Sequence, residues 1–62
     1  MVENTTSKVV KRLTGGGWTL VRHGANHDVY SHTDRPFPIQ VPRHRNLSPG
    51  VARSIAKAAG WI

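Results

Sequence analysis

The sequence predicts an α+β domain in which a three-stranded antiparallel sheet carries two helices on one face, in the order α-β-β-β-α. Helix signals stand near both ends of the chain, and three short segments rich in aromatic and β-branched residues lie between them. Because each helix has an apolar stripe to bury, both are expected on the same face of the sheet. The opposite face is then free to meet a ligand.

The first helix is expected over residues 7–13, with Thr5 or Thr6 as its N-cap. Apolar side chains in this segment recur every three or four residues, and lysine and arginine take the other faces. Three successive glycines at 15–17 end the helix, because each costs about 1 kcal/mol relative to alanine inside a helix.

Three segments are typical of strands and are expected over residues 18–23, 27–32 and 37–41. The small residues 24–26 link the first two segments as a hairpin. Trp18 and Leu20 are expected on one face of the first strand. The third strand alternates, with three apolar side chains on one face: Phe37, Ile39 and Val41. Pro38 has no amide donor, so this strand lies at an edge or pairs only beyond that residue.

The second helix has the clearest start signal in the chain. Ser48 is expected to cap it, and Pro49 suits the first helical position. Gly60 is expected to end the helix, so that residues 61–62 fold back. A basic loop over 42–46 precedes the helix and has no apolar periodicity.

Length and composition restrict the class of protein. The 62 residues predict one domain, 1–62, with a single modest core. The absence of cysteine excludes disulfides and thiolate metal sites. Residues 1–6 lack the pattern of a signal peptide, and no apolar run is long enough to cross a membrane. We therefore expect a cytoplasmic protein with no membrane partner.

The net charge of +6 predicts an anionic partner, either a nucleic acid or an acidic protein. The residue pattern argues against most kinds of catalytic site and leaves a site built on a histidine. His27 and His32 are five residues apart, which sends them to opposite faces of a strand and argues against a metal site. No serine lies in a nucleophile elbow, three acidic residues are too few for carboxylate pairs, and no P-loop or dinucleotide motif is present.

Histidine among arginines and lysines suits RNA cleavage by the RNA's own 2′-hydroxyl, which needs no cofactor. His27 is the best-placed candidate, because it begins the second strand beside a turn with little side-chain bulk. A lone histidine there is otherwise an ordinary surface residue, and His23 and His32 are expected to be solvent-facing or structurally hydrogen-bonded. Arg22, or an arginine of the 42–46 loop, could hold the phosphate, and the sequence leaves that choice open.

The chain resembles the HicA toxin family in these segments: Gly17-Trp18, Arg22, residues 24–30, His32, Val41-Pro42, and Ser48-Pro49-Gly50 to Gly60. The resemblance implies a double-stranded-RNA-binding-like fold and metal-independent mRNA cleavage by the toxin of a type II toxin–antitoxin pair. It also implies a HicB-like antitoxin that holds the enzyme inactive. In the family the catalytic histidine follows a short glycine segment at the head of the second strand, which corresponds to His27. Ala25 replaces the second glycine of the family's longer variant.

With the histidine among basic residues, the resemblance implies an mRNA endoribonuclease, or mRNA interferase, with His27 as general acid and base. The residues expected to attract or clamp the RNA backbone are Lys8, Lys11, Arg12, Arg22, Arg43, His44 and Arg45. The alternative is a non-catalytic small RNA-binding domain in which His27 is a surface contact. A weaker alternative is a small subunit whose charge matches an acidic protein.

Overall fold

A computed structural model describes residues 4–62, and the expectations for the N-terminus that involve residues 1–3 lie outside the described residues. The elements are α1 (Thr6–Gly15), β1 (Thr19–His23), β2 (His27–Ser31), β3 (Ile39–Pro42) and α2 (Pro49–Ala58). This order confirms the predicted α-β-β-β-α arrangement. Within residues 4–62 no helix is long and apolar enough to span a membrane.

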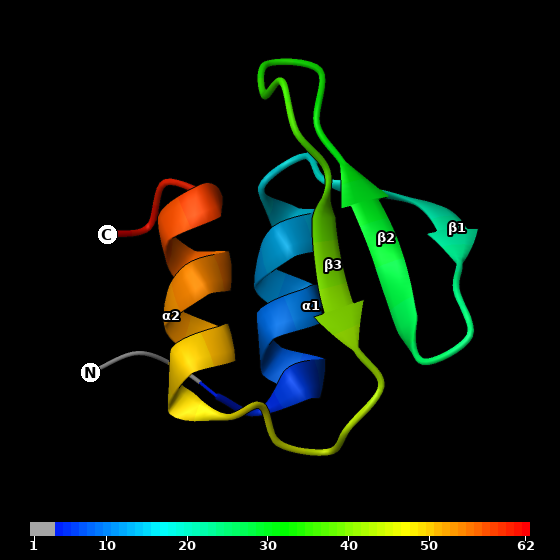
Figure 1. The fold of residues 1–62 in the computed structure, drawn as a ribbon. Coiled ribbons are helices and arrows are strands. Elements are labelled where there is room, and N and C mark those ends of the chain that lie inside the picture. Colours follow the sequence, from blue (N-terminus) through cyan, green and yellow to red (C-terminus); the bar gives the residue numbers. More distant parts are fainter. Residues whose placement is uncertain (1–3) are drawn as a thin grey trace.

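The three strands form one antiparallel sheet with β2 in the centre. Both helices lie side by side on the same side of this sheet, and both contact β3 (Figure 1). The pairing of β1 with β2 is interrupted by an irregularity between Leu20 and Arg22, which leaves Val21 without a partner in the register. The fold is therefore a two-layer α+β arrangement, as the sequence predicts.

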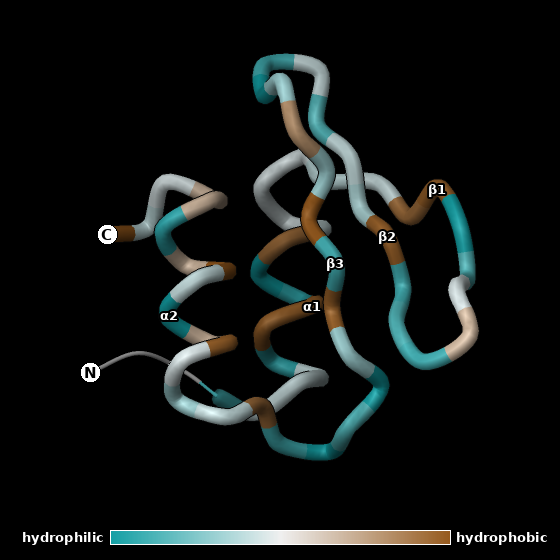
Figure 2. Tube along the Cα trace, viewed as in Figure 1, coloured by the Kyte–Doolittle hydropathy of each residue, from teal (hydrophilic) through white to brown (hydrophobic). Residues whose placement is uncertain are grey.

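The register assigns the side chains of the sheet to two faces. Tyr30 pairs with Ile39, and both are buried in one cluster with Val9 and Leu13 of α1. Figure 2 shows the hydrophobic positions of β3 and both helices gathered between the two layers. Val29 alternates with Tyr30 and does not belong to this cluster, so it marks the outer face of the sheet.

The ends of the strands differ from the prediction. Phe37 is 78% exposed and β3 begins only at Ile39, so the prediction that Phe37 belongs to the strand and shares a face with Ile39 and Val41 is wrong. The physical reason is Pro38, which cannot donate to the ladder, so Phe37 lies in the loop that joins β2 to β3. Trp18 precedes β1 and is buried, whereas Leu20 is 39% exposed. The strand therefore begins one residue later than predicted, and the pairing of Leu20 with Tyr30 places its side chain on the helix side of the sheet, the side on which Trp18 is buried.

The glycine run ends α1 through a Schellman motif. Gly17 takes a left-handed φ of 95° and donates its amide to the carbonyl of Thr14 at 3.3 Å. The next amide, that of Trp18, donates to Leu13 at 3.0 Å. This reversal turns the Trp18 ring back into the core, where it is only 5% exposed.

α2 has the cap and the termination that the sequence predicts. The Ser48 hydroxyl accepts the amide of Val51 at 3.3 Å, so it acts as the N-cap. Gly60 takes a φ of 81°, and the following amide, of Trp61, donates to Ala56 at 2.8 Å. Both helices thus end on a left-handed glycine followed by a tryptophan.

Two glycines of the same run are expected to respond to alanine with opposite signs. Gly17→Ala should lower the free energy of unfolding by about 1–3 kcal/mol, because a Cβ there is strained by the left-handed φ. It would also lie 3.0 Å from Nε2 of His32. Gly15→Ala is the matched control: Gly15 lies in α1, and a Cβ there would meet no atom within 4 Å beyond its chain neighbours and the helix backbone, so the change should stabilise the protein by about 0.5–1 kcal/mol. Urea denaturation measures the free energy of unfolding of both variants. Equal changes in the two variants would contradict the special backbone conformation assigned to Gly17.

Candidate active site

His27 begins β2 and lies on the outer face of the sheet. It pairs with Pro42 of β3 and alternates with Val29 along β2, which places its side chain on the side away from the helices. The residue is half-buried. It is neither sealed in the core nor fully extended into solvent, so the ring is supported and still open to a ligand.

Gly24 faces His27 across the β1–β2 turn. Its amide donates to the main-chain oxygen of His27 at 2.7 Å. A Cβ at Gly24 would lie 2.9 Å from that oxygen and 3.3 Å from Nε2 of the imidazole. Gly24 is not among the left-handed glycines, so clearance for His27 is what requires glycine here. The expectation that the ring lies beside a turn with little bulk agrees with this geometry.

Arg22 and Gln40 share the outer face with His27. Both pair with Val29, Arg22 from β1 and Gln40 from β3, and Val29 is two residues beyond His27. Diagonal neighbours of this kind have Cα atoms about 7–8 Å apart, within reach of long side chains. Arg22 is therefore the predicted arginine that the register brings next to His27. Gln40 was missed, although its place between two inward-facing residues, Ile39 and Val41, signals the same face.

Asp28 lies next to His27 in the chain and binds two basic side chains. Its Oδ1 is 2.8 Å from Nδ1 of His23 and accepts Nε–H of Arg43 at 2.9 Å. The hydrogen bond with His23, followed by the one with Arg43, holds the pKa of Asp28 below its ordinary value of 3.8. His23 is thus hydrogen-bonded, in agreement with its expected structural role.

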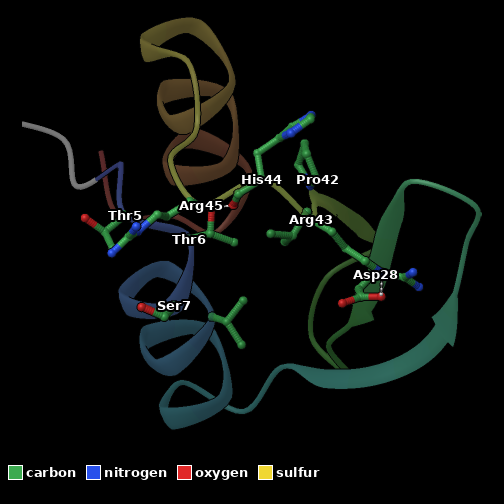
Figure 3. A pocket seen from close by; sticks show the side chains of 10 residues that line it. Thr5, Thr6, Ser7, Asp28, Pro42, Arg43, His44 and Arg45 are labelled. Atoms are coloured by element: carbon green, nitrogen blue, oxygen red, sulfur yellow. Dashed lines mark hydrogen bonds and ion pairs between the residues drawn. The ribbon is translucent and has the colours of Figure 1, made fainter.

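The basic loop lies against the start of α1. The amide of Thr6 donates to the Arg45 carbonyl at 3.1 Å, and the Thr6 hydroxyl donates to the carbonyl of His44. An open groove of about 610 Å³ is lined by this loop, the start of α1 and residues of β2 and β3. In Figure 3 the three basic side chains diverge: Arg43 runs toward Asp28, His44 points away from α1, and Arg45 extends toward Thr5. The groove residues are Thr5, Thr6, Ser7, Val10, Asp28, Val41, Pro42, Arg43, His44 and Arg45.

The remaining predicted RNA contacts are not brought to the same face as His27. Lys8, Lys11 and Arg12 are exposed on α1, which covers the opposite side of the sheet. The guanidinium carbon of Arg12 lies 4.3 Å from the centre of the Trp61 ring, so this arginine also packs against the end of α2. These three residues contribute positive charge at a distance from His27.

His32 has a structural position at the far end of β2. Its Nδ1 accepts the amide of Asp34 at 2.9 Å, so its Nε2–H donates to the carbonyl of Gly16 at 3.1 Å. The ring also lies 5.3 Å from the Trp18 ring, centre to centre. His27 and His32 are therefore apart and differently held. In the part of the chain that the structure describes, no three His, Cys, Asp or Glu side chains gather as metal ligands.

The family model for the HicA toxin of bacterial toxin–antitoxin systems matches residues 6–61. The chain belongs to the HicA toxin family. No curated protein matches the chain. Membership in the HicA family gives the chain the role of a toxin in a toxin–antitoxin system, and it implies an antitoxin as partner. The match confirms the membership in the HicA family that the sequence indicated through its glycine, histidine and Ser-Pro segments.

The lowered pKa of Asp28 predicts how the stability of this HicA-family toxin depends on pH. The folded state favours the carboxylate, so Asp28 stabilises the protein above pH 3.8 and loses that contribution as the pH falls through the lowered pKa. Asp28→Asn should therefore destabilise the protein at about pH 7 and less at about pH 3, where part of the carboxylate contribution is lost.

Urea denaturation at the two pH values measures the difference in free energy of unfolding between wild type and Asp28→Asn. Asp34→Asn is the matched control, because Asp34 forms no ion pair within residues 4–62. A difference for Asp28→Asn that stays constant with pH would show that its carboxylate charge does not support the fold.

Proposed function

We propose that this HicA-family toxin is an endoribonuclease that cleaves mRNA without a metal cofactor, and that His27 is its general acid and base. The observation that carries the proposal is the position of the imidazole. It lies on the helix-free face of the sheet, against a residue with no side chain, and on the same face as Arg22. A phosphate on this face would meet a proton carrier and a cation together.

The chemistry needs one group that moves a proton in both directions. His27 takes the proton from a ribose 2′-hydroxyl, whose oxygen attacks the adjacent phosphorus and breaks the bond to the 5′-oxygen. The imidazolium then returns the proton to the departing 5′-oxygen. The products are a 2′,3′-cyclic phosphate and a free 5′-hydroxyl, so atoms and charge balance without a cofactor.

Tyr30, a neighbour of His27 in the same strand, is unsuited to this role. It lies on the helix side of β2 and is 5% exposed. Burial raises the pKa of the Tyr30 phenol, and the charge of Asp28 raises it further. The phenol therefore stays protonated near neutral pH, and His27 is the better proton carrier.

Arg22 is the residue best placed to stabilise the phosphate. The guanidinium donates in a planar fork that matches two phosphate oxygens, and the negative charge on them grows in the transition state. Arg22 pairs with Val29 on the outer face and is exposed, so its side chain can meet a phosphate beside His27. The structure thus favours Arg22 over the arginines of the basic loop.

The other basic residues attract the RNA backbone. His44 and Arg45 are exposed in the loop after β3, which follows the residue paired with His27. Lys8, Lys11 and Arg12 lie farther away and add to the field of a chain with net charge +6. Binding should therefore weaken steeply as salt rises, since each neutralised phosphate releases counterions.

A HicB-like antitoxin is the proposed protein partner. An acidic surface would complement the +6 charge of the toxin, and covering His27 would block access of RNA to the imidazole. The outer face of the sheet carries no helix in the part of the chain that the structure describes, so it is open to such a partner (Figure 1).

His27→Ala should lower RNA cleavage by at least about 100-fold, because it removes the proton carrier. Affinity for RNA should change little, since the positive charges remain. Cleavage is measured on labelled RNA, with a DNA strand of the same sequence as a substrate that has no 2′-hydroxyl. Expression of the wild type alone should stop growth, and the variant should not. Wild-type protein that binds RNA and never cuts it would favour the non-catalytic RNA-binding domain.

Arg22→Gln should lower the rate of cleavage by about 100-fold, in line with the loss of one transition-state donor. Arg53→Gln is the matched control, because it removes the same charge from the exposed surface of α2. Single-turnover kinetics at saturating protein separates the chemical step from binding. Equal losses in the two variants would show that Arg22 acts only through net charge.

A further inference from the structure

Arg43 holds the turn that carries His27 at three points. Its main-chain amide donates to the carbonyl of Asn26 at 3.1 Å. Its Nη2 donates to the carbonyl of Gly24 at 2.9 Å, and its Nε donates to Oδ1 of Asp28 at 2.9 Å. One residue of the basic loop therefore binds the turn before His27 and the residue after it.

These bonds compete with a role for Arg43 in binding phosphate. Two nitrogens of its guanidinium already have acceptors, and its charge is paired with a carboxylate. Arg45, two residues later, differs: it is exposed and forms no ion pair with any residue in the range 4–62. The arginines of the loop thus have different surroundings despite their proximity in the sequence.

Gly24 lies between Arg43 and the imidazole of His27 and contacts both. The carbonyl of Gly24 is held by Arg43, and its amide is held by the carbonyl of His27 at 2.7 Å. The imidazole lies directly against Gly24, with Nε2 only 3.3 Å from where a Cβ would be. A shift of the Gly24 peptide would therefore move the surface that supports the ring.

We propose that Arg43 is a positioning residue, which fixes the Gly24 peptide and thereby the imidazole of His27, and that it contributes little direct affinity for RNA. This inference rests on the proposed role of His27 in cleavage. It replaces the expectation that Arg43 clamps the backbone alongside Arg45. The paired carboxylate of Asp28 belongs to the same arrangement, because it orients the guanidinium toward Gly24.

The kinetic test compares Arg43→Gln with Arg45→Gln, since each removes one positive charge from the same loop. Arg43→Gln should lower kcat by about 10- to 100-fold, as expected when a reacting group is misplaced by an ångström or less, with KM changed less than about twofold. Arg45→Gln should act mainly on KM. Arg43→Lys should recover part of kcat, because an ammonium can keep the ion pair with Asp28 but does not reproduce the fork.

A spectroscopic test needs no activity. The ring signals of His27 in a ¹H–¹⁵N spectrum should shift in Arg43→Gln and stay in place in Arg45→Gln. If Arg43→Gln fails to fold, Arg43→Lys and Asp28→Asn provide the same comparison through smaller changes. Unmoved His27 signals together with a rise in KM equal to that of Arg45→Gln would overturn the proposal.

The cleavage of RNA by His27 and the positioning of His27 by Arg43 can be tested separately. If the wild type cuts no RNA, the proposed function is wrong, and the ring signals of His27 still decide whether Arg43 positions the imidazole. If His27→Ala abolishes cleavage while Arg43→Gln leaves kcat unchanged, the function stands and the positioning role is wrong.

Discussion

The burial of one sheet face under two helices is the constraint on which this small structure depends. A chain of 62 residues has apolar side chains for a single core, and Leu13, Val9 and Val41 are the largest that are fully buried. Because successive strand residues point to opposite faces, committing Tyr30 and Ile39 to the core sends His27 to the other side. The position of the catalytic candidate thus follows from the packing of the core.

Electrostatics then distinguishes residues that the net charge treats as equal. Asp28 is an acidic side chain between two basic partners in a chain with nine lysines and arginines and three acids. It binds His23 and Arg43, so these two are engaged in holding the hairpin. Arg22 and Arg45 have no ion pair within residues 4–62. The charge near His27 that is available to an RNA phosphate is therefore smaller than the number of basic residues indicates.

The sequence predicted the order of elements because its local signals are strong: Ser48 and Pro49 start α2, and left-handed glycines end both helices. It also predicted that His27 lies beside a turn without bulk, since Gly24 is close in the chain. The hydrogen bonds from Arg43 to Asp28 and Gly24 could not be predicted, because they join residues 15 and 19 positions apart. Such contacts depend on how the basic loop lies against the β1–β2 turn, which no local pattern in the sequence indicates.

The irregularity in β1 has a consequence for how the protein behaves at high concentration. β1 is an edge strand, exposed along its whole length, and an unprotected edge can recruit another chain and seed aggregation. The extra residue at Val21 disturbs the spacing that an incoming strand would have to match. The irregularity at Val21 therefore works against edge-to-edge joining of isolated molecules along β1.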